Sequence, residues 1–416
     1  MKRITASGLA LSISATALLA ACGGSQPPIG APGAMEQTLQ AVRSYQVLYS
    51  FGHNADDGRD PHDRLTNIGG TLYGTTVFGG KRRCSAGYNC GTVFSITTGG
   101  TETVLYSFKT ENDGANPEAA LIDVAGTLYG TTYSGAYGFG TVFSITTGGT
   151  EKVLHSFGNG TDARNPAASL IEVKGTLYGT TEFGGKHNRG TIFSITTSGY
   201  ERVLHSSTGG SDGANPARAL VDVNGTLYGT TNRGGAHTCG RYRCGTVFSI
   251  TTGGTEKVLH NFNGTDGQGP DAGLLDVNGT LYGTTSKGGA YTCGGITCGT
   301  VFSITTGGAQ KVLHSFNGTD GEDPAAGLLN VSGALYGTTY LGGEHTCAGI
   351  TCGTVFRITT RGAEKVLHSF AGGSDGALPL AGLIKANGSL YGTTSGGGGG
   401  SGCSGNGCGT VFSISP

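Results

Sequence analysis

The sequence predicts an all-β fold, a seven-bladed β-propeller of four-stranded blades, from three observations. Three short β-type segments each recur seven times along the chain. Glycine supplies 81 of 416 residues without a Gly-X-Y period, which excludes collagen and favours a turn-dense β architecture. The last unit lacks the one segment that stands alone before the first unit. Four short strands in roughly 50 residues are typical of a propeller blade.

The three strong segments keep the same order in every unit. GTLYGTT or a near copy forms the second strand, GTVFSIT the third, and VLHSF or VLYSF the fourth, while a weaker apolar segment such as residues 119–124 forms the first. The second strands begin at Gly70, Gly126, Gly175, Gly225, Gly279, Gly333 and Gly388. The third strands begin at Gly91, Gly140, Gly190, Gly245, Gly299, Gly353 and Gly409. The fourth strands begin at Val47, Val104, Val153, Val203, Val258, Val312 and Val366.

Turn chemistry supports these strands. Asn224-Gly225, Asn278-Gly279 and Asn387-Gly388 lie between the first two strands of their units. A two-residue type I′ hairpin needs positive φ at both positions, which Asn-Gly supplies. We therefore interpret the apparent Asn-Gly-Thr glycosylation sequons as turns.

The two ends of the repeat region are complementary. The C-terminal unit ends at Pro416 after its third strand, and residues 47–51 supply a fourth strand that precedes the first unit. We expect this N-terminal strand to complete the last blade and close the ring, so that no long sheet edge stays open. The alternative is an open β-solenoid, which would not require the last unit to lack the strand that the N-terminal segment supplies.

The N-terminal 44 residues predict export. Lys2 and Arg3 precede an apolar run that is too short to span a membrane comfortably and that ends in Leu-Ala-Ala before Cys22. This resembles a bacterial lipoprotein signal, which implies removal of residues 1–21, acylation of Cys22, and sorting to the outer membrane in a Gram-negative cell. Residues 22–44 then form a lipidated cysteine and flexible tether, and residues 45–416 the propeller domain. An ordinary secretory signal with an incidental cysteine remains the alternative.

The order of the segments also resembles a known family. The tandem GTLYGTT…GTVFSIT…VLHSF pattern behind a lipobox is similar to the bacterial GloVer-type tandem-repeat proteins, whose members carry varied membrane anchors. The resemblance covers residues 45–416 and implies an exported, tethered propeller. It implies no activity and no catalytic residues.

Composition excludes several partners and cofactors. A net charge of −1 gives no electrostatic footprint for nucleic acid, and a charged fraction of 13% suits an extracytoplasmic surface. The absence of tryptophan argues against quinone-cofactor propellers. We expect no cofactor, no metal and a monomer, with the lipid bilayer as partner through acylated Cys22 and an envelope glycan or protein as ligand.

Ten cysteines form five local pairs, each five residues apart and each between the second and third strands of one unit. Units 2 and 3 lack the pair, and their connections are shorter. In an oxidising compartment each pair is best interpreted as a disulfide staple, because a zinc site would need three or four convergent ligands. Redox and metal roles remain alternatives. The predicted pairs are Cys84/Cys90, Cys239/Cys244, Cys293/Cys298, Cys347/Cys352 and Cys403/Cys408.

Sequence variety is concentrated on one face of the predicted ring. Because antiparallel strands alternate in direction, the cysteine loops and the loops that lead into the next blade share a face, and loops on a rigid scaffold commonly carry binding groups. The basic and aromatic residues of blades 1 to 4 there suit sugars, carboxylates or phosphates, with an ordinary solvated surface as the alternative. The candidates are Lys81, Arg82, Arg83, Tyr88, Tyr133, Tyr137, Phe139, Lys186, His187, Arg189, Arg233, His237, Arg241, Tyr242 and Arg243.

Two other sets of polar residues follow the repeat. Five histidines (His155, His205, His260, His314 and His368) share one position in the fourth strand, with Tyr49 and Tyr106 in the other two units, so we expect them to be structural and too dispersed to meet at one metal. An aspartate precedes each proline turn, where its carboxylate can accept a backbone N–H; calcium binding there lacks the usual carboxylate density.

The sequence favours a membrane-tethered binding or scaffolding module over an enzyme. Glu182 is the nearest catalytic candidate, with His187 five residues on, but no second acid and no nucleophile motif accompany it. A propeller hydrolase or lyase acting on a polysaccharide is one alternative, and a purely structural surface repeat is another. Propeller folds host many functions, so the fold alone does not choose among them.

Overall fold

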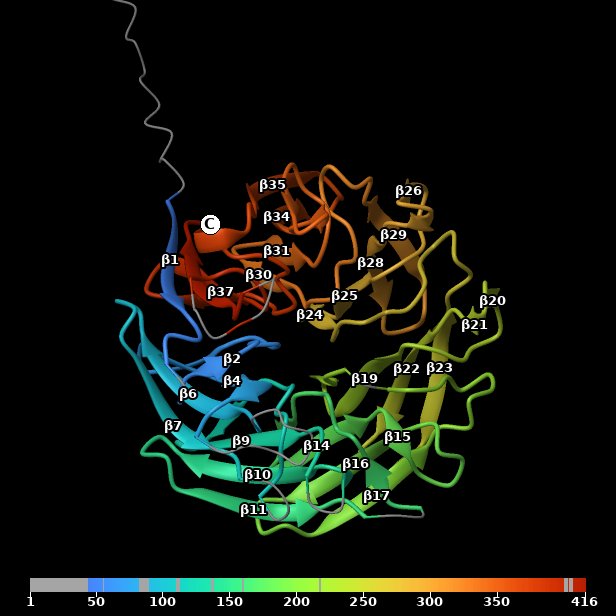
Figure 1. Ribbon diagram of the computed structural model, residues 1–416. Helices are drawn as coiled ribbons and strands as arrows, with labels where there is room; N and C mark the ends of the chain where they lie inside the picture. The colour runs from blue at the N-terminus through green and yellow to red at the C-terminus, as the bar shows by residue number, and fades with distance from the viewer. Residues whose placement is uncertain are drawn as a thin grey trace, which may run out of the picture. The chain divides into compact units, whose positions relative to one another are not determined.

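A computed structural model describes residues 44–54, 56–81, 90–109, 113–135, 138–158, 161–216, 218–399, 403 and 407–416, shown as a ribbon in Figure 1. These residues belong to one compact unit. The predicted signal peptide, Cys22 and the tether lie outside the described residues and stay predictions. Within the described part of the chain, no helix is long and apolar enough to cross a membrane.

Seven antiparallel four-stranded sheets follow one another around the ring, which confirms the predicted fold class (Figure 1). Blade 1 contains β3 (Thr66–Ile68), β4 (Thr71–Thr76), β6 (Thr92–Thr97) and β7 (Glu102–Ser107). Blade 2 contains β8 (Ile122–Val124), β9 (Thr127–Thr132), β10 (Thr141–Thr146) and β11 (Glu151–Ser156). Blade 3 contains β13 (Ile171–Val173), β14 (Thr176–Thr181), β16 (Thr191–Thr196) and β17 (Glu201–Ser206).

The remaining blades repeat this order. Blade 4 contains β18 (Val221–Val223), β19 (Thr226–Thr231), β22 (Thr246–Thr251) and β23 (Glu256–Asn261). Blade 5 contains β24 (Leu275–Val277), β25 (Thr280–Thr285), β28 (Thr300–Thr305) and β29 (Gln310–Ser315). Blade 6 contains β30 (Leu329–Val331), β31 (Ala334–Thr339), β34 (Thr354–Thr359) and β35 (Glu364–Ser369). Blade 7 contains β36 (Ile384–Ala386), β37 (Ser389–Thr394), β38 (Thr410–Ile414) and β1 (Tyr45–Ser50).

Short two-stranded pairings and the 3₁₀ turn η2 lie in the described loops. The pairs are β2 (Gly58–Arg59) with β5 (Phe78–Gly79), β12 (Ala163–Arg164) with β15 (Phe183–Gly184), β20 (Thr238–Cys239) with β21 (Tyr242–Arg243), β26 (Thr292–Cys293) with β27 (Ile296–Thr297), and β32 (Thr346–Cys347) with β33 (Ile350–Thr351). The 3₁₀ turn is η2 (Gly373–Asp375).

The last blade joins the two ends of the described chain. β1 runs antiparallel to β38, with Tyr45 opposite Ile414 and Ser50 opposite Thr410. The strand begins two residues before the predicted segment. Phe51 follows it and packs edge-to-face on Phe94 of blade 1, with ring centroids 5.1 Å apart. The N-terminal strand therefore contributes both to the sheet of blade 7 and to the core between blades 7 and 1.

The glycine inside each second strand is explained by the third strand beside it. A Cβ at Gly229 would lie 2.6 Å from the ring of Phe248, well inside van der Waals contact. Phe248 is buried at the interface between blades 3 and 4, in the same apolar cluster as Leu220. The second glycine of the GTLYGTT motif thus leaves the space that the phenylalanine of the neighbouring third strand occupies.

A second phenylalanine crosses most blade interfaces. Phe262 at the end of blade 4 packs edge-to-face on Phe302 of blade 5, and Phe316 packs in the same way on Phe356. Ser207 takes this position at the interface between blades 3 and 4 and is buried. The cores of the ring therefore lie between neighbouring blades, and each blade needs its neighbour to cover its apolar face.

A polar group of three residues, here called the blade latch, repeats at the outer edge of each interface. It consists of the histidine or tyrosine of one fourth strand, the aspartate of the following loop, and the residue that opens the fourth strand of the next blade. Between blades 3 and 4 these are His205, Asp212 and Glu256, with His205 Nε2 3.3 Å from Asp212 Oδ2. The histidines predicted to be structural take part in these latches.

The latch glutamates carry an unusual charge state. Burial, and then the negative charge of the facing aspartate, raise the pKa of Glu102, Glu151, Glu201 and Glu256 to about 7. Between blades 4 and 5 the same position is Gln310, a neutral amide of the same shape as a protonated glutamate. This replacement indicates that a neutral side chain suits the position.

We predict that stability falls as the pH rises through about 7. The pKa of Glu256 is about 7 in the folded protein against an ordinary value of 4.5, so the folded state keeps a proton that the unfolded chain loses between these pH values. The stabilisation is complete below pH 4.5 and is lost as the pH passes the folded pKa. Glu256→Gln should therefore lose less unfolding free energy between about pH 5.5 and about pH 8.5 than wild type, measured by urea unfolding.

The matched control is Glu344→Gln, because Glu344 is exposed. Equal pH slopes for Glu256→Gln and Glu344→Gln would contradict the assignment of the titration to the latch.

Candidate functional site

The loops that enter each blade share one backbone device, a residue with positive φ immediately before a proline. Asn215 has φ of 55°, although a residue before proline normally takes an extended conformation. Its N–H donates to Arg189 O at 2.7 Å, and its carbonyl accepts from Asn232 N–H at 3.2 Å. Leu378 holds the same position and conformation in blade 7. These bonds tie each entering loop to the preceding blade and fix the residues that follow the proline.

Those residues line a cavity at the axis of the ring. The cavity has a volume of about 600 Å³, within the range of small-molecule sites, and the first strands of several blades contribute to its wall. The wall is acidic, because six carboxylates face only two arginines among the described residues. The charged residues are Asp63, Glu118, Glu172, Asp222, Asp271, Asp276, Arg64 and Arg218.

The cavity is asymmetric because the repeat is broken after the prolines. Blades 3 and 6 place alanine directly after the proline, as Ala167 and Ala325. Blades 1, 2 and 5 place His62, Glu118 and Asp271 there instead. Reasoning from the sequence missed these residues, although a charged residue at a position occupied by alanine elsewhere was a visible signal.

Several cavity residues are held by bonds between blades. Arg218 Nη2 of blade 4 lies 3.0 Å from Asp271 Oδ1, which also accepts from Asn232 Nδ2 at 2.7 Å. Asp63 Oδ2 accepts from Ala120 N–H at 2.8 Å and from Ser169 Oγ at 2.9 Å, so it connects three blades. The wall is therefore rigid at these points and preorganised for a ligand.

The pKa values around the cavity reflect its low solvent exposure and its charge pattern. Burial raises the pKa of Glu118, partly offset by the charges of His62 and Arg218. Burial, and then the charge of Asp271, raise the pKa of nearby Asp323 to about 6. Burial lowers the pKa of His62, but its hydrogen bond to Asp60 outweighs this and the net shift is upward. The site thus favours positive charge on a ligand or on His62.

Glu182 lies beside this group of charges. It accepts a hydrogen bond from Tyr133 Oη at 3.1 Å, and its charge raises the pKa of Glu118. The sequence offered no second acid for Glu182, and the ring supplies one from the neighbouring blade. Glu118 itself has no hydrogen-bond or ion-pair partner among the described residues.

The predicted basic and aromatic residues that the structure describes lie in the loops around the rim of the ring and are not gathered into one site. Arg233 stacks over the ring of Tyr242 at 4.1 Å, and the ring of Phe139 lies under Arg164 at 5.1 Å. Arg82, Arg83, Tyr88 and Tyr137 lie outside the described residues. The exposed candidates are Lys81, Lys186, His187, Arg189, Arg233, His237, Arg241, Tyr242 and Arg243.

Sequence analysis missed a second feature of this rim. Tyr242, Ile296 and Ile350 occupy the same position in the small hairpins of blades 4, 5 and 6, each opposite the first cysteine of its loop. Each of the three side chains is about half exposed, so three neighbouring hairpins present apolar groups to solvent.

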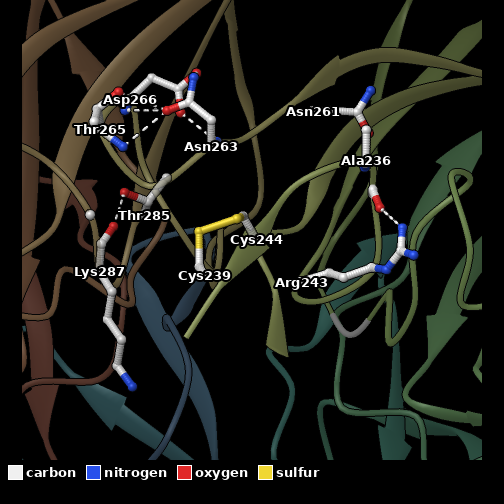
Figure 2. Close-up of a disulfide and its surroundings, with 12 residues drawn as sticks. Ala236, Cys239, Arg243, Cys244, Asn261, Asn263, Thr265, Asp266, Thr285 and Lys287 are labelled. Atoms are coloured by element: carbon white, nitrogen blue, oxygen red, sulfur yellow. Dashed lines mark hydrogen bonds between the residues drawn. A yellow bond between two sulfur atoms is a disulfide. The ribbon is translucent and has the colours of Figure 1, made fainter. Parts of the chain in front are cut away.

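Four of the predicted disulfides are present, and three of them staple these hairpins. The bonds are Cys239–Cys244, Cys293–Cys298, Cys347–Cys352 and Cys403–Cys408. Their Cα atoms lie 5.2 to 5.5 Å apart, within the usual range. Cys90 is also disulfide-bonded, and Cys84 lies outside the described residues. Figure 2 shows the Cys239–Cys244 bond between Arg243 and the turn that contains Asn263 and Asp266.

The stapled loop of blade 4 is also held by polar contacts. Arg243 Nη1 donates to Gly235 O, and Ala236 N–H donates to Asn261 Oδ1 at 2.8 Å. The disulfide lies close to the next entering loop, because a Cβ at Gly264 would lie 3.2 Å from Cys239 Sγ. The Cys239–Cys244 disulfide is therefore a structural staple.

Comparison with known proteins identifies the repeat. The family model described as the Gloeobacter/Verrucomicrobia repeat matches residues 33–243 and 237–416, which confirms the GloVer-type resemblance. No curated protein matches the sequence.

Solved structures that resemble this chain do so at low identity. The luciferin-regenerating enzyme is 12% identical with a TM-score of 0.43, over 90% of this chain and 95% of that one. A europium-containing methanol dehydrogenase is 8% identical with a TM-score of 0.47, over 89% and 93%. A Bacteroides uniformis protein named as a candidate 6-phosphogluconolactonase is 13% identical with a TM-score of 0.45, over 73% and 83%.

We predict that the blade 4 staple contributes about 2 kcal/mol to stability through the entropy of the short loop that it closes. Replacing Cys239 and Cys244 together by serine should lower the unfolding free energy by this amount under non-reducing conditions. Reducing conditions should bring wild type toward the double variant. A double variant as stable as wild type without reductant would contradict a structural role.

Proposed function

The chain belongs to the Gloeobacter/Verrucomicrobia repeat family, and from that premise and the acidic axial cavity we propose that it is a binding module for an amine- and hydroxyl-bearing envelope glycan. The four disulfides described indicate an extracytoplasmic protein. Acylated Cys22 would tether it to the bilayer.

The observation that carries the proposal is the unpaired Glu118 in a wall of carboxylates. Ammonium and hydroxyl groups donate hydrogen bonds to carboxylates, and a charged hydrogen bond in a site of low exposure contributes more than a neutral one. Arg218 is already neutralised by Asp271, so it does not cancel the charge of Glu118 by direct pairing. An anionic ligand would meet net repulsion in this cavity.

The rim residues complete the proposal. A glycan chain that leaves the cavity would pass over the exposed Tyr242 and Arg233, whose stacked side chains offer a flat face to a sugar ring. The predicted basic and aromatic residues then serve the distal part of the chain, and the axial carboxylates hold its end.

Glu118→Gln tests this function. We expect its affinity for glucosamine oligomers, measured by calorimetry, to fall by about tenfold or more, since a charge-assisted hydrogen bond contributes about 1.5–3 kcal/mol. Glu344→Gln, an exposed carboxylate outside the cavity, is the matched control. Unchanged affinity in Glu118→Gln, or equally tight binding of glucuronate oligomers, would refute the axial site.

Hydrolysis of the glycan is a second candidate function, favoured by the electrostatic effect of Glu182 on Glu118. Glycosidases use one carboxylic acid of raised pKa and one second carboxylate, and burial supplies the first condition at Glu118. Tyr133 orients Glu182 from the adjacent blade. Catalysis would be established if wild type releases shorter products from the bound oligomers and Glu182→Gln does not. If the oligomers bind and no products form, the protein is a binding module.

A further inference from the structure

The blade latch between blades 2 and 3 differs from the other histidine latches. In these, the histidine Nε2 lies 2.9 to 3.3 Å from the aspartate Oδ2. Between blades 2 and 3 the distance from His155 Nε2 to Asp162 Oδ2 is 3.8 Å, too long for a hydrogen bond. His155 Nε2 is buried, and within the described part of the chain it has no hydrogen-bond partner. This latch is therefore open where the others are closed.

Three donor atoms converge there. His155 Nε2 and one carboxylate oxygen each from Asp162 and Glu201 all lie within 4.8 Å of one another. Glu201 Oε1 is also buried and has no hydrogen-bond partner among the residues that the structure describes. Burial, and then the charge of Asp162, raise the pKa of Glu201 to about 7, and the charge of His155 offsets this rise only in part.

We propose that His155, Asp162 and Glu201 form a binding site for a divalent transition-metal ion of the Zn²⁺ type. One imidazole nitrogen and two carboxylate oxygens are accepted zinc ligands, and two carboxylates balance the charge of the ion. Calcium prefers an all-oxygen set, so the histidine favours Zn²⁺ over Ca²⁺. The three side chains are partly exposed, which leaves room for water to complete the coordination.

The surrounding backbone holds the central ligand in place. Gly158 N–H donates to Asp162 Oδ2 at 2.6 Å, and Ala163 N–H donates to Asp162 Oδ1 at 2.8 Å. Such bonds fix the direction of a carboxylate while leaving further lone pairs for a metal. Orientation of Asp162 therefore does not depend on the metal.

The other latches provide comparisons within the same chain. His314, Asp320 and Glu364 bring the same donors within 4.8 Å, but His314 Nε2 already lies 3.0 Å from Asp320 Oδ2, so a metal would have to displace that bond. Gln310 replaces the glutamate between blades 4 and 5, and tyrosines replace the histidine in two more latches. We therefore expect one tight site, with any binding at His314 weaker.

The location of the open latch suggests what the metal would do. Blades 2 and 3 are the two blades without a cysteine pair. The ion would connect the fourth strand of blade 2, through His155, to the fourth strand of blade 3, through Glu201. It would thus hold together a part of the ring that has no disulfide staples.

The test uses the full chain carrying Cys22→Ser and no histidine tag, stripped with a chelator and titrated with Zn²⁺ against a chromophoric competitor. We expect one tight equivalent and a rise in melting temperature on adding Zn²⁺, with a much smaller response to Ca²⁺. Glu201→Gln, which keeps the shape of the side chain, should lose both the tight equivalent and the thermal shift. Glu256→Gln in the closed latch between blades 3 and 4 should keep both.

Three results would overturn the proposal. They are the absence of a saturable equivalent in the stripped wild-type chain, retention of the tight equivalent in Glu201→Gln, and a thermal shift with Ca²⁺ as large as with Zn²⁺. Circular dichroism of Glu201→Gln without metal establishes that a lost equivalent reflects lost ligation, since a misfolded variant would differ from the metal-free wild type.

Discussion

Burial of each blade against its neighbour is the constraint on which the rest of the structure depends. A four-stranded blade exposes apolar faces that only the next blade covers, and the phenylalanine pairs such as Phe262 with Phe302 lie across these interfaces. A row of such blades stays incomplete at both ends unless it closes on itself. The pairing of β1 with β38 provides the last sheet with its outer strand, and Phe51 carries the same chain segment into the core beside blade 1.

The part of the structure that the sequence predicts is the part that repeats. The Gly of GTLYGTT and the Phe of GTVFSIT recur together, so strand order, blade number and the positions of the cysteine loops followed from the repeat alone. The axial residues Glu118, Arg218 and Asp271 did not, because they come from three blades and meet only through the curvature of the ring. The latch glutamates were missed for the same reason, since Glu201 opens a strand about 40 residues after Asp162 and belongs to a different blade.

The same interfaces carry structure and chemistry. A latch such as His205–Asp212–Glu256 places two carboxylates side by side at partial burial. This is tolerated because the glutamate can hold a proton. In the next latch Gln310, which is neutral, takes the position of the glutamate. The latch of His155 has the same residue types but a longer histidine–aspartate distance, and its histidine Nε2 is buried without a hydrogen-bond partner among the described residues. A metal site can therefore arise from a structural repeat without any new residue type.

Departures from the repeat also show where the hydrogen bonding between neighbouring blades differs around the ring. Six threonines, Thr75 to Thr338 in equivalent positions, donate to a carbonyl of the next blade at 2.9 to 3.3 Å. The seventh, Thr393 of blade 7, has a buried hydroxyl with no hydrogen-bond partner in the described ranges. The interface that it faces is the one that joins the two ends of the chain, and the entering loop there carries Asp63, whose side chain bonds to blades 2 and 3. The carboxylate of Asp63, which bonds to blades 2 and 3, thus lies on the loop that follows the interface where this repeated threonine bond is missing.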